Sequence, residues 1–256
     1  MSLLFLEERN KQSFTKITNC RWQLERIVVS NTTKRIVIPV KAGIFPQKFM
    51  TKIYLISPPK INLADFSQSL QSALETGLVP AFQLRLKDCD NQEILKSAQE
   101  LKKICHDNNC LFLLNDSCQM ALDAGADGVH LGVDDDSIAT ARKNSSKNFI
   151  IGASCYNSRH LAIEAAEQGA DYLSFGAFFP TTTKIARSKA TTEIIEWSRE
   201  VMDLPVTAIG GITAENCAPL VKSGVDFLAV ISFVWQHPQG VKAALQSMNK
   251  AIISLS

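Results

Sequence analysis

AGADGVHL (124–131) sets the pattern that decides the fold, because the chain repeats it as QGADYLSFG (168–176) and SGVDFLAVIS (223–232). Each copy places a glycine and an aspartate directly before an apolar, β-prone run. A glycine at this point is typical of a helix C-terminus, where it adopts the left-handed conformation without a Cβ clash. Three such helix-to-strand junctions predict a repeating βα architecture. The aspartates of the three turns are expected to be structural: Asp127, Asp171 and Asp226.

The same alternation extends outward from these junctions along most of the chain. Eight short β-rich runs occupy residues 52–57, 81–86, 111–115, 127–131, 149–154, 171–176, 205–210 and 226–232. Helix-length segments separate them, and a last helix is expected at 239–250. The pattern predicts an α/β protein with a closed (β/α)8 TIM barrel over residues 50–256. An open doubly wound sheet is disfavoured because no GxGxxG follows the first strand.

Residues 1–49 break this alternation and form an N-terminal extension whose structure the sequence does not define. A hairpin, a disordered arm and an upstream extension before Met50 all stay open. The first 50 residues hold nine Lys/Arg against three Asp/Glu, within a net charge of +2. This mild basic excess lacks interleaved aromatic residues, so we expect no nucleic-acid partner.

Composition favours a soluble protein with one large core. The chain has 256 residues, 46% of them hydrophobic, and a mean hydropathy of +0.02. No apolar run approaches the roughly 18 to 20 residues that span a bilayer, and the start is a poor signal peptide, so we expect no membrane partner and a cytoplasmic location. Seven scattered cysteines without a CxxC pair are expected to be small buried residues, which excludes a disulfide framework and a zinc site.

Polar residues at strand ends are the candidates for chemistry, because TIM barrels place their active sites at the carboxyl ends of the strands. In QLRLK (83–87), alternation puts Gln83, Arg85 and Lys87 on one face and two leucines on the other. We expect the polar face to point inward near the barrel mouth. Two cations there favour an anionic ligand such as a phosphate, with an ion pair inside the barrel as the alternative.

Carboxylates follow the next two strands. Asn115 and Asp116 end the third run, and Asp134–Asp136 follows the fourth. Beside two cations, these carboxylates suggest a Mg²⁺ ion that bridges to a pyrophosphate. Spacing alone does not separate Asp135 from Asp136, and the triplet can equally cap the following helix.

Two further strand ends have the composition of phosphate sites. The sixth run leads into GAFFPTTTKIARSKA (176–190), whose hydroxyls and cations can bind phosphate and close over a ligand, although a solvated loop is the alternative. IGGIT (209–213) and AVIS (229–232) end the last two strands, where TIM barrels often bind phosphate. No residue stands out as a nucleophile with its own base, which favours catalysis by positioning and electrostatics.

Together these motifs resemble the thiamine phosphate synthase family over roughly residues 52–250. The resemblance rests on QLRLK, LLNDS, GADGVHLGVDD, IIGAS, GADYLSFGAFFPTTTK, AIGGIT and AVIS in family order. It implies a Mg²⁺-dependent transferase of thiamine biosynthesis. Such an enzyme joins two small-molecule substrates, hydroxymethylpyrimidine diphosphate and thiazole phosphate, to give thiamine phosphate and pyrophosphate.

The resemblance also assigns roles to individual residues. It implies pyrimidine diphosphate binding by Gln83, Arg85, Lys87, Asn115 and Lys184, and Mg²⁺ binding by Asp116 and Asp135. It places Ser154 near the pyrophosphate, and it places Thr181, Thr183, Gly211, Ile231 and Ser232 at the thiazole phosphate. It gives catalytic roles, through charge stabilisation on the departing pyrophosphate, to Arg85, Lys87, Ser154 and Lys184.

The chain departs from the family pattern at three places: Leu86 replaces an acidic residue, Val133 replaces a glutamine, and no glycine follows Lys184 in the loop. The alternatives are a thiazole tautomerase-like isomerase, a non-catalytic phosphate-binding regulator, and a phosphosugar isomerase or aldolase. The tautomerase commonly has a histidine two residues beyond the fifth-strand serine, where this chain has Tyr156. The sequence leaves the oligomeric state open, including a homo-oligomer.

Overall fold

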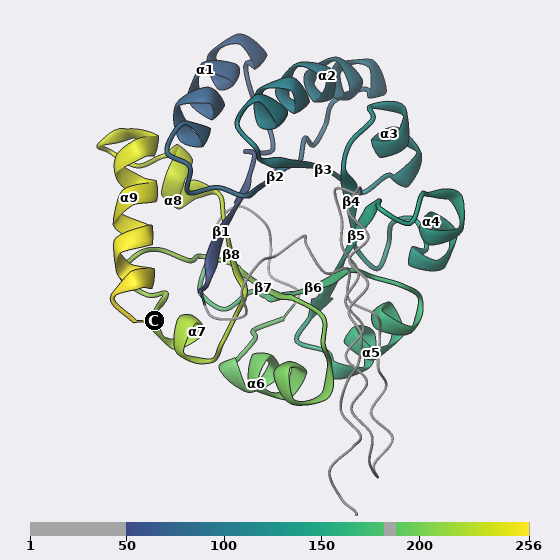
Figure 1. The fold of residues 1–256 in the computed structure, drawn as a ribbon, viewed down its shortest axis with the longest axis vertical. Coiled ribbons are helices and arrows are strands. Elements are labelled where there is room, and N and C mark those ends of the chain that lie inside the picture. The colour runs from purple at the N-terminus through teal and green to yellow at the C-terminus, as the bar shows by residue number, and fades with distance from the viewer. Residues whose placement is uncertain (1–49, 182–187, 256) are drawn as a thin grey trace, which may run out of the picture.

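Parallel strands pair in chain order and close into a barrel, with β1 hydrogen-bonded to both β2 and β8 (Figure 1). The computed structural model describes residues 50–181 and 188–255, so the N-terminal extension, Thr183 and Lys184 lie outside the described residues. The strands are β1 (Lys52–Ile56), β2 (Ala81–Leu84), β3 (Leu111–Asn115), β4 (Gly128–Leu131), β5 (Ile150–Tyr156), β6 (Tyr172–Gly176), β7 (Val206–Ile209) and β8 (Phe227–Val230). The predicted TIM barrel is confirmed, while the separation of residues 1–49 as a unit stays a prediction.

Helices form a ring outside the strands (Figure 1). They are α1 (Leu63–Leu74), α2 (Asn91–Asp107), α3 (Cys118–Asp123), α4 (Ile138–Asn144), α5 (Arg159–Glu167), α6 (Thr192–Val201), α7 (Ala218–Lys222), α8 (Ser232–Trp235) and α9 (Gly240–Ile253). The predicted last helix corresponds to α9. The short α8 was not predicted, and the eighth strand ends at Val230 because Ile231, at ψ −87°, has left the extended conformation.

The repeated Gly-x-Asp turns are structural, as their sequence indicated. Gly125, Gly169 and Gly224 have φ of 63°, 98° and 81°, the left-handed conformation expected after a helix. The side chain of each aspartate accepts a hydrogen bond from a backbone N–H at the start of the preceding odd-numbered strand. It also contacts a cationic or imidazole side chain on the helix before that odd-numbered strand. The partners are Phe112 N and His106 for Asp127, Ile151 N and Arg142 for Asp171, and Val206 N and Arg199 for Asp226.

Strand alternation divides the core into two layers. One layer fills the barrel interior and consists of Tyr54, Ile56, Ala81, Leu113, Ile150, Tyr172, Phe227 and Ala229. The other lies between the strands and the helices and includes Leu84 and Leu86. Gln83 therefore faces the interior, and the predicted division of QLRLK into a polar inner face and an apolar outer face is confirmed.

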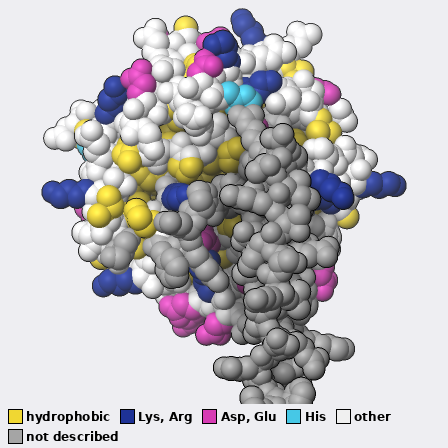
Figure 2. All heavy atoms as spheres, viewed as in Figure 1, with side chains coloured by type: hydrophobic (Ala, Val, Ile, Leu, Met, Phe, Trp, Pro, Cys, Tyr) yellow, Lys and Arg dark blue, Asp and Glu magenta, His cyan; other side chains and the backbone are white. Residues whose placement is uncertain are grey.

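The surface carries charges of both signs. Figure 2 shows Lys, Arg, Asp and Glu side chains mixed around the perimeter of one face, with hydrophobic side chains nearer its middle. Within residues 50–181 and 188–255, every helix is too short or too polar to cross a membrane. Of the described cysteines, Cys89 is partly buried and the others are buried, and none of them forms a disulfide.

Candidate active site

A cavity of about 520 Å³ opens among the carboxyl-terminal ends of the strands. Its volume falls within the range of small-molecule sites. Every predicted site residue that the structure describes lines it: Gln83, Arg85, Lys87, Asn115, Asp116, Asp135, Ser154, Thr181, Gly211, Ile231 and Ser232. Residues from β2, β3, β5 and β8 thus meet in one place, as the strand-end argument predicted.

The end of β2 carries two nitrogen donors that lack an acceptor in the part of the chain that the structure describes. Gln83 is 2% exposed, and its Nε2 has no hydrogen-bond partner among the described residues. Arg85 Nη1 is buried and equally unpartnered there. Ser57 Oγ accepts a hydrogen bond from Arg85 N at 2.8 Å and so fixes this strand end. Buried donors are normally satisfied, so both nitrogens indicate an oxygen-rich ligand in the cavity.

Charged groups oppose each other beside these donors. Burial lowers the pKa of Arg85, and the charges of Asp116 and Asp135 partly offset this effect. Asp116 forms an ion pair with Lys87 and accepts a hydrogen bond from Asn115 Nδ2. The ion pair expected as the alternative to ligand binding therefore exists, although Arg85 Nη1 takes no part in it.

Asp135 is the member of its acidic triplet that lines the cavity. Its Oδ2 accepts a hydrogen bond from Gly132 N at 2.6 Å. Partial burial raises the pKa of Asp135, and the neighbouring Asp116 charge raises it further. Asp136 instead accepts from Cys118 N at 2.8 Å at the start of α3, and Ser137 caps α4. The structure thus separates two carboxylates that spacing left equivalent.

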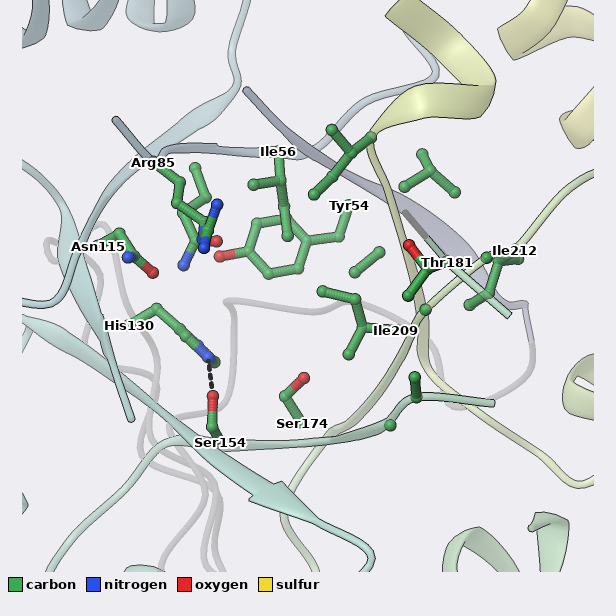
Figure 3. Close-up of a pocket in the computed structure, with 18 of the residues that line it drawn as sticks. Tyr54, Ile56, Arg85, Asn115, His130, Ser154, Ser174, Thr181, Ile209 and Ile212 are labelled. Carbon is green, nitrogen blue, oxygen red and sulfur yellow. Dashed lines mark hydrogen bonds between the residues drawn. The ribbon is translucent and has the colours of Figure 1, made fainter. Parts of the chain in front are cut away.

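A histidine that the sequence argument did not select lies at the centre of the site. His130 Nε2 lies 2.9 Å from Ser154 Oγ, and its Nδ1 lies 2.8 Å from Tyr172 Oη. Figure 3 shows the His130–Ser154 contact facing the cavity. A lone histidine in the apolar run GVHL is usually a core residue, so its sequence neighbours gave no signal. The signal that could have identified it is strand alternation, which puts His130 on the inner face near the carboxyl end of β4.

The loops after β7 and β8 bring backbone close to the cavity. Gly211 has φ of 60°, and a Cβ on it would lie 2.2 Å from Pro180 O. Asn216 holds this loop, because its Nδ2 donates to Gly211 O at 2.9 Å and its Oδ1 accepts from Thr213 N at 2.8 Å. Only glycine fits this conformation and this space, which lets backbone amides approach a ligand.

The cavity is polar on one side and apolar on the other. In Figure 3, Arg85, Asn115, His130 and Ser154 follow one another along one side. Across from them lie the side chains of Ile209 and Ile212, with Thr181 beside them. Such a division suits ligands that combine flat rings with anionic groups.

A family model described as thiamine monophosphate synthase matches residues 53–234. The chain belongs to the thiamine-phosphate synthase family. A thiamine-phosphate synthase from Rhodospirillum centenum is 43% identical over 201 residues, covering 78% of this chain and 97% of the relative. Another from Erythrobacter litoralis is 45% identical over 206 residues, covering 79% and 95%. The predicted family and its transferase class in thiamine biosynthesis are thereby confirmed.

Solved structures agree with this membership. Thiamine phosphate pyrophosphorylase from Pyrococcus furiosus superposes with a TM-score of 0.70 at 34% identity, covering 81% of this chain and 98% of that one. A 3-hexulose-6-phosphate synthase superposes with a TM-score of 0.60 at 15% identity, covering 78% and 99%, and shows the shared barrel fold alone.

Two of the three departures from the family pattern lie outside the cavity lining. Leu86 is buried between strands and helices, and Val133 is 48% exposed. Tyr156 does line the cavity, at the β5 bulge, with φ of 53°. The third departure concerns the loop that follows Lys184, of which residues 185–187 lie outside the described residues.

Proposed function

We propose that this thiamine-phosphate synthase family member joins hydroxymethylpyrimidine diphosphate to thiazole phosphate in a Mg²⁺-dependent reaction that releases pyrophosphate. The observation that carries the proposal is a pair of donors, Gln83 Nε2 and Arg85 Nη1, that have no partner within residues 50–181 and 188–255. They lie beside Lys87 and two carboxylates in one cavity. Donors of this kind fit a diphosphate, and the apolar wall opposite fits two heterocycles.

The residues present fit a Mg²⁺ ion. Mg²⁺ in phosphate-transfer sites takes one or two carboxylates and completes its shell with phosphate oxygens and water. Asp116 and Asp135 supply two carboxylates whose charges act on each other. In the part of the chain that the structure describes, no three potential ligand side chains gather, so the remaining ligands would come from the diphosphate or water. When bound, the ion would neutralise negative charge on the diphosphate oxygens.

In the proposed reaction, the bond from the pyrimidine methylene carbon to the diphosphate oxygen breaks. A bond from that carbon to the thiazole nitrogen forms, and the nitrogen keeps the positive charge. No proton has to move, which explains why the site needs no nucleophile with its own base. Arg85, Lys87, Ser154 and Lys184 would stabilise charge that grows on the leaving pyrophosphate.

The other predicted residues would position the two rings. Gln83 and Asn115 would hold the pyrimidine diphosphate, with Ile209 and Ile212 excluding water from the reacting atoms. Thiazole phosphate binding would use the hydroxyls of the 181–183 loop and the backbone at the ends of β7 and β8: Thr181, Thr183, Gly211, Ile231 and Ser232.

The test is pyrophosphate release by the purified protein with Mg²⁺ and both substrates. We expect release that stops when either substrate or Mg²⁺ is omitted. Asp116→Ala and Lys184→Ala are expected to lower kcat by at least about 100-fold, because each removes charge compensation in the transition state. Unchanged circular dichroism would show that both variants fold.

Asp135→Asn and Asp134→Asn form a matched pair for the metal site. Asp135 lines the cavity, whereas its neighbour Asp134 does not. We expect loss of activity in Asp135→Asn and normal activity in Asp134→Asn.

If the unchanged protein released no pyrophosphate but bound thiazole phosphate tightly, that result would instead support a tautomerase or a phosphate-binding regulator.

A further inference from the structure

Hydrogen bonds connect the cavity wall to the centre of the barrel. Ser154 Oγ lies 2.9 Å from His130 Nε2, and His130 Nδ1 lies 2.8 Å from Tyr172 Oη. Tyr172 Oη lies 2.9 Å from Tyr54 Oη. The four side chains come from β5, β4, β6 and β1, and we refer to them as the Ser–His–Tyr–Tyr chain. Both tyrosines are 4% exposed. Ser154, His130 and Tyr54 line the cavity, whereas Tyr172 does not and belongs to the interior layer of the barrel core.

The protons of the chain can be assigned by counting donors and acceptors. Burial raises the pKa of both Tyr54 and Tyr172, so each phenol keeps its single proton. Tyr172 is the one hydrogen-bond partner of Tyr54 Oη among the described residues. If Tyr54 accepted the proton of Tyr172, its own O–H would have no acceptor among the described residues, which is disfavoured for a side chain that is 4% exposed. Tyr54 therefore donates to Tyr172.

The remaining directions follow from this first one. Tyr172, which accepts from Tyr54, donates its proton to His130 Nδ1. A neutral imidazole whose Nδ1 accepts must carry its proton on Nε2. His130 Nε2–H then donates to Ser154 Oγ, and the hydroxyl proton of Ser154 is left for an acceptor in the cavity.

We propose that Tyr54 and Tyr172 are positioning residues that hold His130 as the Nε2–H tautomer and thereby make Ser154 a hydrogen-bond donor to the bound diphosphate. This inference rests on the proposed function. It also excludes a serine nucleophile activated by His130, since that reaction needs Nε2 as an acceptor. Ser154 instead aims its proton at oxygens that gain negative charge in the transition state.

Packing inside the barrel holds the side chains of the Ser–His–Tyr–Tyr chain in place. A Cβ on Gly152 would lie 2.0 Å from Tyr172 Cζ, so the glycine reserves space for this ring. The rings of Tyr54 and Tyr172 meet edge-on, at 81° and 6.0 Å between centroids. The Tyr172 ring also stacks on His130, with centroids 5.6 Å apart. Phenylalanine would fill this space without a buried hydroxyl, which suggests that the phenols serve the hydrogen bonds.

Nitrogen-15 NMR of the unchanged protein near neutral pH tests the tautomer directly. The protein has four histidines, and comparison of its spectrum with that of His130→Gln assigns the His130 signals. We expect a protonated Nε2 and an unprotonated Nδ1 on His130. A proton on Nδ1, or an imidazolium, would overturn the inference. This readout needs no substrate, so it is independent of the proposed activity.

Steady-state kinetics test the link to Ser154. We expect Tyr172→Phe and Ser154→Ala each to lower kcat about 10-fold or more with little change in KM, because the affected hydrogen bond strengthens in the transition state. The kcat of the double variant should lie within about 2-fold of the kcat of the less active single variant. If the two single-variant losses of kcat multiplied in the double variant, Tyr172 would act independently of Ser154, and the proposed positioning role would be wrong.

Thr207→Val is the matched control, because it removes a buried hydroxyl on β7 that lies outside both the chain and the cavity lining. It should leave kcat and the His130 tautomer unchanged. If the unchanged enzyme released no pyrophosphate, the proposed function would fail, whereas an Nδ1 proton would contradict this inference alone.

Discussion

Among the described residues, four side chains carry a buried polar atom without a hydrogen-bond partner: Gln83, Arg85, Ser145 and Thr207. Gln83 Nε2 and Arg85 Nη1 belong to residues that line the cavity, where a ligand can satisfy them. Thr207 Oγ1 is also unpartnered among the described residues, but Thr207 does not line the cavity. An unsatisfied group destabilises the fold by about 1–3 kcal/mol, so it persists more readily where function requires it. Thr207 lies outside the cavity lining, so no ligand there is expected to compensate its unpartnered hydroxyl.

We therefore predict that Thr207→Val raises the free energy of unfolding by about 1 kcal/mol, because valine has nearly the same shape without the buried hydroxyl. Urea denaturation measures the change. Thr51→Val is the control, since Thr51 Oγ1 donates to Val225 O at 2.8 Å. The same substitution there should lower stability by a similar amount. A loss of stability in Thr207→Val would show that its hydroxyl has a partner such as water.

Residue-level prediction succeeded where strand alternation determines the outcome. The period of two placed Gln83 and Arg85 on the inner face, and the structure agrees. His130 was missed because its importance comes from Ser154 and Tyr172, which lie 24 and 42 residues away in the chain. No local pattern encodes contacts of that kind. The distinction between Asp135 and Asp136 also depended on tertiary structure, since Asp136 contacts the start of α3.

Among the elements, the three Asp-containing turns tie odd-numbered strands to the helices before them. Each aspartate combines a backbone hydrogen bond with a contact to His106, Arg142 or Arg199. The sequence repeat revealed these turns because the same geometry recurs at every second strand. By contrast, the four-residue α8 is too short for a periodic signal, so it escaped prediction.

At this scale we predict that Asp171→Ala destabilises the barrel by about 2–3 kcal/mol, because it removes the acceptor for Ile151 N and the partner of Arg142. Asp171→Asn should cost less, since its amide oxygen can still accept from Ile151 N. Asp107→Ala is the comparison, because Asp107 pairs with Lys103 on an exposed helix surface and should cost only a few tenths of a kcal/mol. Equal costs at both sites, measured by denaturant unfolding, would contradict a structural role for the turn.

For the whole molecule, closure of the barrel gathers residues that are far apart in the chain. The count of eight strands was sufficient to predict closure, because parallel βα units place every strand's carboxyl end at one mouth. Cavity volume and the identity of unpartnered donors could not be predicted, since they depend on how side chains pack around that mouth. The oligomeric state stays open, and the cytoplasmic location stays a prediction.

Binding at this mouth should stabilise the entire fold. Inorganic pyrophosphate with Mg²⁺, at about 100 times its Kd, contributes about 2.7 kcal/mol, which corresponds to a rise in Tm of roughly 5 to 10 °C for a domain of this size. Without Mg²⁺ the rise should be smaller, because Asp116 and Asp135 then repel the anion. Differential scanning fluorimetry measures both conditions.

Asp135→Asn separates the metal contribution from the rest. Without ligand, this variant should have a higher Tm than the unchanged protein, because it removes a carboxylate charge that Asp116 and partial burial disfavour. With pyrophosphate, its Tm should respond little to added Mg²⁺, whereas Asp134→Asn should keep the full response. An undiminished Mg²⁺ effect in Asp135→Asn would place the ion elsewhere. The cost that these neighbouring carboxylates impose on the free enzyme is therefore the expected counterpart of their affinity for the metal.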